Sequence, residues 1–119
     1  MSDRPTFDLQ IDPTDTCPIF KLQGRLMDQQ QADRLLSSLE EGLAGGQPHV
    51  VLDMSDLQYM NSTGLNILIN VLTRTRNAGG DTLIAGVSNS VRQLFLVTKL
   101  DTVFTMTATI DEAVAKLNA

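Results

Sequence analysis

Residues 49–77 read HVVLDMSDLQYMNSTGLNILINVLTRTRN, in which an apolar strand and a polar turn lead into an apolar helix. Val50, Val51 and Leu52 form the continuous apolar run that is typical of a strand covered on both faces. The helix is predicted from apolar residues at three- and four-residue spacing, namely Leu65, Ile67, Leu68, Val71 and Leu72. The stretch therefore indicates a strand followed by a helix, as in an α/β sheet.

The predicted helix begins at the turn Asn61-Ser62-Thr63-Gly64 and stops at Asn77-Ala78-Gly79-Gly80. Either Asn61 or Ser62 is a suitable N-cap, because a short side-chain oxygen accepts a hydrogen bond from a free N–H group of the first turn. In an open α/β sheet, ligands, phosphates and partners arrive where strands end and helices begin. The turn is therefore a candidate site, although helix capping alone is the simpler interpretation of its residue types.

The N-terminal part of the chain predicts a β-hairpin followed by a helix. Thr6–Ile11 alternates apolar and polar residues as a half-buried strand does, and residues 12–15 form the turn after it. Pro18–Leu22 is the second strand, which Gly24 ends, and a short loop over Arg25–Asp28 follows. Gln29–Leu43 has the apolar spacing of an amphipathic helix, which Gly45, Gly46 and Pro48 close.

The C-terminal part predicts two more strands and two more helices. Thr82–Ala85 is a second buried strand, and a strand, a helix and a strand joined by short links imply a right-handed parallel crossover. Ser88 or Ser90 caps a helix that ends near Lys99, and Val103–Met106 is a short last strand. Thr109–Glu112 has the pattern of a capping box, and a helix continues from it to Leu117.

Composition agrees with one compact domain over residues 1–119. The chain is 42% hydrophobic and 19% charged, has no linker or internal repeat, and is long enough to bury an ordinary core. We therefore predict an α/β domain with a mixed sheet of four or five strands, packed with about four helices.

Charge and hydropathy exclude several classes of partner. The net charge of −5 and the absence of clustered Lys and Arg argue against binding to nucleic acid or an anionic membrane. Neither a signal peptide nor a run of eighteen apolar residues is present, so we expect a cytoplasmic protein. The single cysteine, Cys17, excludes an internal disulfide and is better explained as a buried strand thiol than as a reactive one.

Catalytic and cofactor chemistry is not indicated. The only histidine, His49, begins the strand whose far end leads to Ser62, so it lies too far away to act as a base for that hydroxyl. One histidine and one cysteine do not make a metal site, and no Gly-rich phosphate loop is found. Asp53 and Asp56 are better explained as turn formers than as a catalytic carboxylate pair. We predict no cofactor, no metal and no enzymatic activity.

Several residues are predicted to share one edge of the sheet with Ser62, because each follows a strand within a few positions. They are Met27, Asp28, Asn61, Thr63 and Ser88. Met27 and Met60 both fall in predicted loops at this edge. This position slightly favours a role for the two side chains in a contact surface over a role in the core. The edge is therefore predicted to bind a protein partner.

Residues 50–65 resemble the signature of STAS domains, and in particular that of the bacterial anti-sigma factor antagonists. In that signature an apolar strand, an Asp and a short turn precede Asp-Ser-Ser/Thr-Gly-Leu. The resemblance extends over nearly the whole chain, including Leu22–Leu26, Ala78–Val87 and Val91–Phe104. Two positions depart from the pattern: Asn61 replaces the usual Asp, and Met27 stands where an acidic residue is common, with Asp28 one place later.

The resemblance implies a function. Ser62 matches the serine that is phosphorylated by a partner anti-sigma factor, which is itself a serine kinase. The unphosphorylated antagonist binds that anti-sigma factor and frees the sigma factor for transcription. A second hypothesis is a scaffold or transport-accessory STAS subunit that binds its partner constitutively and uses Ser62 only as a cap. A nucleotide-binding or hydrolytic enzyme is the weakest hypothesis, because the sequence shows neither a general base nor a phosphate-binding loop.

Overall fold

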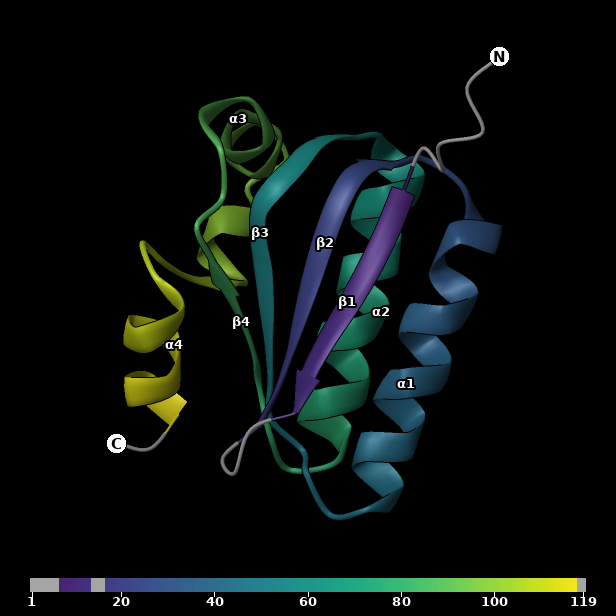
Figure 1. Ribbon diagram of the computed structural model, residues 1–119. Coiled ribbons are helices and arrows are strands. Elements are labelled where there is room, and N and C mark those ends of the chain that lie inside the picture. The colour runs from purple at the N-terminus through teal and green to yellow at the C-terminus, as the bar shows by residue number, and fades with distance from the viewer. Residues whose placement is uncertain (1–6, 14–16, 118–119) are drawn as a thin grey trace.

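A five-stranded sheet forms the centre of the computed structural model, which describes residues 7–13 and 17–117 (Figure 1). Its strands lie in the order β1 (Phe7–Pro13), β2 (Pro18–Leu26), β3 (Val50–Met60), β4 (Thr82–Ala85) and β5 (Thr105–Thr107). β1 is antiparallel to β2, and all other neighbours are parallel. This confirms the predicted α/β class and the mixed sheet.

Helices cover the two faces of the sheet unequally. They are α1 (Asp33–Ala44), α2 (Ser62–Asn77), α3 (Asn89–Val97) and α4 (Ile110–Leu117), with 3₁₀ turns η1 (Gln29–Ala32) before α1 and η2 (Leu100–Thr102) after α3. Figure 1 shows α1 and α2 side by side behind the sheet and α4 on its other side, next to β4. The half of the front face formed by β1 and β2 has no helix over it. None of the helices in the described residues is both long and apolar enough to span a bilayer.

The core lies on both sides of the sheet. The larger cluster packs β1, β2 and β3 against α1, α2 and α3 and includes Phe20, Leu52 and Phe95. The smaller one places Cys17 and strand residues such as Ile19 under α4. Cys17 is fully buried, as predicted, but it lies just before β2 and not within a strand. Two well-covered faces explain why β4 is buried along its whole length.

The polar turn predicted before the α2 helix is wrong, because β3 continues to Met60. Two register shifts occur against β2: Lys21 pairs with Asp53 but Gln23 with Asp56, and Gly24 pairs with Leu57 but Arg25 with Tyr59. Each shift adds one residue to β3, as a β-bulge does. The buried residues after Asp53 are therefore Met54, Leu57 and Met60, which recur at every third position. A half-buried strand is recognised in a sequence by apolar residues at every second position, so this stretch does not look like a strand.

Other element boundaries differ by a few residues. β2 passes through Gly24, which has a positive φ of 89°, and ends at Leu26, so the predicted loop is shorter. The helix predicted from Gln29 begins as a 3₁₀ turn, and α1 starts at Asp33. The last strand starts at Thr105, because Phe104 is buried against Phe95 with ring centroids 5.5 Å apart in an edge-to-face arrangement. The predicted strand start Thr6 and the turn residues 14 and 15 lie outside the described residues.

Candidate functional site

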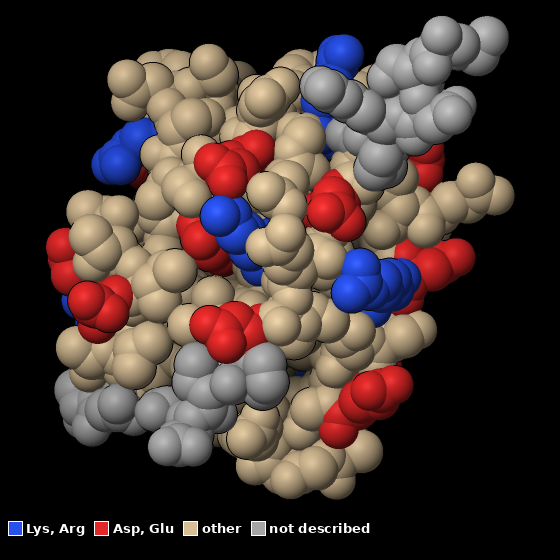
Figure 2. Space-filling view, in the orientation of Figure 1, with Lys and Arg blue, Asp and Glu red and all other residues tan. Residues whose placement is uncertain are grey.

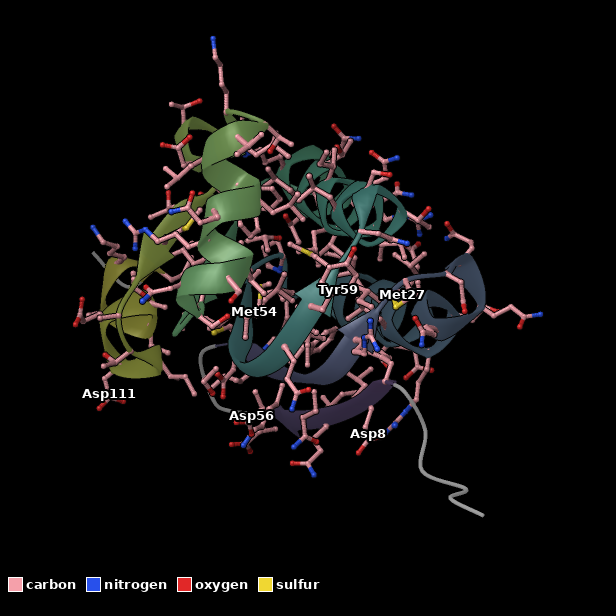
Figure 3. The ribbon with its side chains drawn as sticks, turned by 90° about the horizontal axis from the view of Figure 1, so that it is seen from above. Asp8, Met27, Met54, Asp56, Tyr59 and Asp111 are labelled. Carbon is pink, nitrogen blue, oxygen red and sulfur yellow. The ribbon has the colours of Figure 1, made fainter. Side chains whose placement is uncertain are left out.

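The N-terminus of α2 lies at the edge where β2 and β3 both end, as predicted. β2 and β3 are paired up to Leu26 and Met60, so the loops after both strands leave the sheet at the same place. Figure 3 looks down on this edge and shows Met27 and Tyr59 near each other above the ends of the two strands. The edge therefore brings residues 25–28 together with residues 58–63.

Asn61 connects the two loops and caps α2. Its Oδ1 atom accepts a hydrogen bond from the Gly64 N–H group at 3.0 Å, and its Nδ2 group donates to the Met27 carbonyl at 3.0 Å. Its backbone N–H group donates to the Leu26 carbonyl at 3.4 Å. An aspartate here would keep the acceptor for Gly64 but lose the donor to Met27. Asparagine at this position therefore ties the start of α2 to the end of β2.

Ser62 is the first residue of α2 and is exposed. Its hydroxyl group makes no hydrogen bond to any residue that the structure describes, because Asn61 is the cap. Of the two N-caps that the sequence allowed, the structure uses Asn61. The Ser62 hydroxyl is therefore free to react without loss of a structural contact.

We expect Asn61→Ala to lower the free energy of unfolding by about 1–2 kcal/mol and Ser62→Ala by less than about 0.5 kcal/mol. The first change removes both the cap and the bond to Met27, whereas the second removes an exposed hydroxyl. Urea unfolding followed by circular dichroism measures both values. Equal losses for the two variants would show that Ser62 shares the capping role.

Met27 and Asp28 occupy the loop that faces Ser62. The Met27 side chain is 37% exposed, and Asp28 is exposed. Asp28 is the N-cap of η1: its Oδ1 atom accepts from the Gln31 N–H group at 3.0 Å, while Gln31 Oε1 accepts from the N–H groups of Met27 and Asp28. The capping box holds Met27 at the surface. Met60, by contrast, is only 2% exposed, so its prediction as contact surface was wrong.

A groove of about 410 Å³ runs from Ser62 to α3. One wall is the end of β3 and the start of α2, and the other is the face of α3. It is lined by Gln58, Tyr59, Met60, Asn61, Ser62, Ser90, Val91, Gln93, Leu94 and Val97, none of which is formally charged. Tyr59 is 46% exposed and Val97 is 77% exposed. An uncharged groove with exposed large apolar side chains is typical of a protein-binding surface.

The sequence pointed to part of one wall of this groove, Asn61 and Ser62, from the helix start. Tyr59 on the same wall was missed because it fell in a predicted turn. Leu94 and Val97 on the other wall were also missed, although α3 carries apolar residues on more than one face, which is the signal that points to an additional contact.

Thr63 and Ser88 were predicted at the same edge, and their environments differ. Thr63 is the second residue of α2 and is half-buried. Ser88 is the N-cap of α3, where its Oγ atom accepts from the Val91 N–H group at 3.4 Å. Ser88 does not line the groove, whereas Ser90, two residues later, does. The hydroxyl of Ser88 therefore has a structural role.

Arg25 provides a positive charge beside the groove. Its guanidinium carbon lies 5.3 Å from the centroid of the Tyr59 ring, a cation–π contact between paired residues of β2 and β3. Arg and Tyr are the side chains most enriched where proteins bind one another tightly. The Arg25–Tyr59 pair therefore extends the candidate surface toward Met27.

His49 lies at the other end of β3, where its Nδ1 atom accepts a hydrogen bond from the Asp81 N–H group at 3.2 Å. Eleven strand residues separate it from the turn that holds Ser62. The described residues contain no group of three His, Cys, Asp or Glu side chains able to hold a metal ion. The groove therefore offers a hydroxyl and an apolar surface, and the only histidine lies at the opposite end of β3.

Comparison with known families agrees with this geometry. The sequence-family model of the STAS domain matches residues 8–113 of this chain. The chain belongs to the STAS domain family. This confirms that the sequence resembles STAS domains, over a range that includes residues 50–65.

Relatives of this STAS domain carry names from sigma-factor regulation. BtrV of Bordetella bronchiseptica, named as a candidate anti-sigma factor antagonist, is 28% identical over 96 residues, covering 81% of this chain and 82% of BtrV. The crystal structure of an anti-sigma factor antagonist from Mycobacterium paratuberculosis has a TM-score of 0.80 at 21% identity, covering 95% of both chains. The phosphorylated form of SpoIIAA from Bacillus has a TM-score of 0.71 at 18% identity, covering 92% of this chain and 98% of SpoIIAA. These solved structures share the fold.

Proposed function

We propose that this STAS domain is an anti-sigma factor antagonist that binds an anti-sigma factor with serine kinase activity and is released when Ser62 is phosphorylated. The observation that carries the proposal is the exposed Ser62 hydroxyl, free of structural hydrogen bonds, at the mouth of an uncharged groove. BtrV and the Mycobacterium paratuberculosis protein, which the chain resembles, are named as anti-sigma factor antagonists, and SpoIIAA is known in a phosphorylated form.

Phosphorylation would change the character of this surface. A phosphate adds about −1.5 to −2 charge at pH 7. No residue that lines the groove is charged, so the phosphate would be its dominant charge. An apolar partner group that packs beside Ser62 would then have to strip water from the phosphate or move away from it. Either change weakens binding. Release would thus come from local repulsion and desolvation rather than from a change of fold.

The test is phosphorylation by the purified anti-sigma factor from the same organism, with ATP, followed by mass spectrometry. We expect one phosphate on Ser62 and dissociation of the complex. Ser62→Ala should bind the partner and stay bound with ATP present, and Thr63→Val, which removes the neighbouring hydroxyl, should still be phosphorylated. Transfer of phosphate to Thr63 alone would mean that Ser62 is not the phosphorylated residue. A complex that ATP does not affect would favour a constitutive STAS scaffold.

We expect phosphorylation of Ser62 to leave the melting temperature unchanged or to raise it by up to about 5 °C. The phosphate would lie at the positive end of the α2 dipole, next to N–H groups that have no partner within the helix. Differential scanning calorimetry of the modified protein, before and after phosphatase treatment, measures the effect. A lower melting temperature that the phosphatase restores would show that the switch acts by destabilising the fold.

A further inference from the structure

Met27 is the most exposed of the methionines that the structure describes. It is 37% exposed, whereas Met54 and Met60 are buried and Met106 is half-buried. A peroxide oxidises a methionine only where it reaches the sulfur atom, so exposure decides which thioether reacts first. Met27 is therefore the described methionine that an oxidant reaches most easily.

The fold does not depend on the Met27 side chain. Met27 belongs to neither core cluster, whereas the other three described methionines pack in the larger cluster or against it. Backbone groups hold the loop instead: the Met27 N–H group donates to Gln31 Oε1 at 2.7 Å, and the Met27 carbonyl accepts from Asn61 Nδ2 at 3.0 Å. A change confined to the sulfur atom therefore leaves these hydrogen bonds and the packing of the core in place.

Met27 lies beside the groove at Ser62. Asn61, which donates to the Met27 carbonyl, lines that groove and directly precedes Ser62. Figure 3 shows Met27 and Tyr59 near each other above the ends of β2 and β3, and Tyr59 lines the same groove. A partner that covers the groove at Ser62 therefore also meets Met27.

The surface on the groove side of Met27 is uncharged. None of the residues that line the groove carries a formal charge. Figure 2 shows charged side chains gathered over the front of the strands, and mostly tan surface at the upper left, where α3 lies. A methionine side chain is flexible and adapts its shape to an apolar partner group. Met27 thus adds an apolar contact to this surface.

Oxidation would reverse the character of this contact. Methionine sulfoxide is polar, and its oxygen is a hydrogen-bond acceptor that water solvates. Burial of that oxygen under an apolar partner group costs free energy unless a donor meets it. An oxidised Met27 therefore opposes the same contact that the thioether favours.

We propose that Met27 is an oxidation site, and that its sulfoxide prevents the anti-sigma factor from binding this surface. Hydrogen peroxide transfers one oxygen atom to the sulfur: an S–O bond forms, the O–O bond breaks, the sulfur loses two electrons and the peroxide is reduced to water. Methionine sulfoxide reductases remove the oxygen, so the change is reversible. The effect on binding rests on the proposed function, whereas the oxidation itself does not.

The test is limited oxidation of the full chain with hydrogen peroxide, followed by peptide mapping by mass spectrometry. We expect one added oxygen on Met27 before any on Met54, Met60 or Met106, with an unchanged circular dichroism spectrum. The oxidised chain should bind the purified anti-sigma factor at least about tenfold more weakly in isothermal titration calorimetry. Treatment with methionine sulfoxide reductases should restore the affinity.

Two variants show whether Met27 carries the effect. Met27→Leu has no sulfur at this position, so peroxide should leave its affinity at whatever value the untreated variant has. Met106→Leu removes a methionine outside the groove, and its affinity should fall on oxidation as that of the wild-type chain does. A loss of affinity in oxidised Met27→Leu as large as in the wild type would assign the effect to another residue and overturn the proposal.

The remaining outcomes separate this proposal from the proposed function. Oxidation of Met60 or Met106 before Met27 would overturn Met27 as the oxidation site. Equal affinity of the oxidised and unmodified chains would overturn its effect on binding, and if ATP still dissociates that complex, the proposed function of Ser62 stands. A chain that does not bind the anti-sigma factor even before oxidation would overturn both proposals.

Discussion

Gly64→Ala is expected to destabilise the domain by about 3 kcal/mol, because the added methyl group has no room. A Cβ atom at this position would overlap the Leu26 carbonyl oxygen and come within 2.9 Å of the Met60 Cβ atom. The carbonyl belongs to the backbone of β2, so the start of α2 would have to move away from the sheet. That movement would strain the Asn61 bonds to Met27 and Gly64, and urea unfolding measures the loss.

Gly42→Ala is the matched control for this prediction. Gly42 lies inside α1, and a Cβ atom there would meet nothing closer than the Gln47 carbonyl oxygen at 4.0 Å. Alanine is the better helix former, so this variant should gain about 0.5–1 kcal/mol. If Gly64→Ala is as stable as Gly42→Ala, the close approach of α2 to β2 in this structure is wrong.

Val97→Arg is expected to weaken binding of the anti-sigma factor about 100-fold, or by about 2.7 kcal/mol, if the partner occupies the groove beside Ser62. Val97 is 77% exposed and forms part of the α3 wall. Arginine would place a charge and a long side chain in an uncharged groove. Because Val97 ends α3, where cations are favourable, the melting temperature should not fall. Isothermal titration calorimetry with the purified partner measures the affinity.

Ala115→Arg is the control for the binding experiment. Ala115 is exposed on α4, on the other face of the sheet, and the substitution adds the same side chain and charge. Its affinity should stay within about twofold of the wild-type value. If Ala115→Arg abolishes binding and Val97→Arg does not, the partner binds the α4 side and the proposed surface is misplaced.

Helices and strands were predictable where the spacing of apolar residues in the sequence matched the repeat of the element. The spacing of Leu65, Leu68 and Leu72 predicted α2, and the helix ends at Asn77, before Gly79 and Gly80, as expected. The apolar run Thr82–Ala85 is β4 with the same bounds. The Thr109 hydroxyl accepts from the Glu112 N–H group at 3.1 Å, which is the predicted cap of α4. These features depend on residues within one or two turns of each other.

The second half of β3 was not predictable in this way. Its bulges exist because β2 and β3 pair with shifted register, and the sequence of β3 does not reveal the register of its neighbour. As a result, residues 53–60 appeared to be a turn. Asp53, interpreted as a turn former, instead lies buried in a strand and holds Ser55 at the first bulge.

The local pattern of residues 49–77 was enough to establish the α/β class and the helix that begins at Ser62, because backbone hydrogen bonds and apolar periodicity are short-range properties. It also carried the STAS signature. Packing between distant segments established the rest: Gly64 has to be glycine because the Leu26 backbone passes beside it. Asn61 is the cap because the Met27 carbonyl orients its amide. The groove exists because α3 lies against β3. Such contacts join residues that are far apart along the chain, so their energies appear only when the chain has folded.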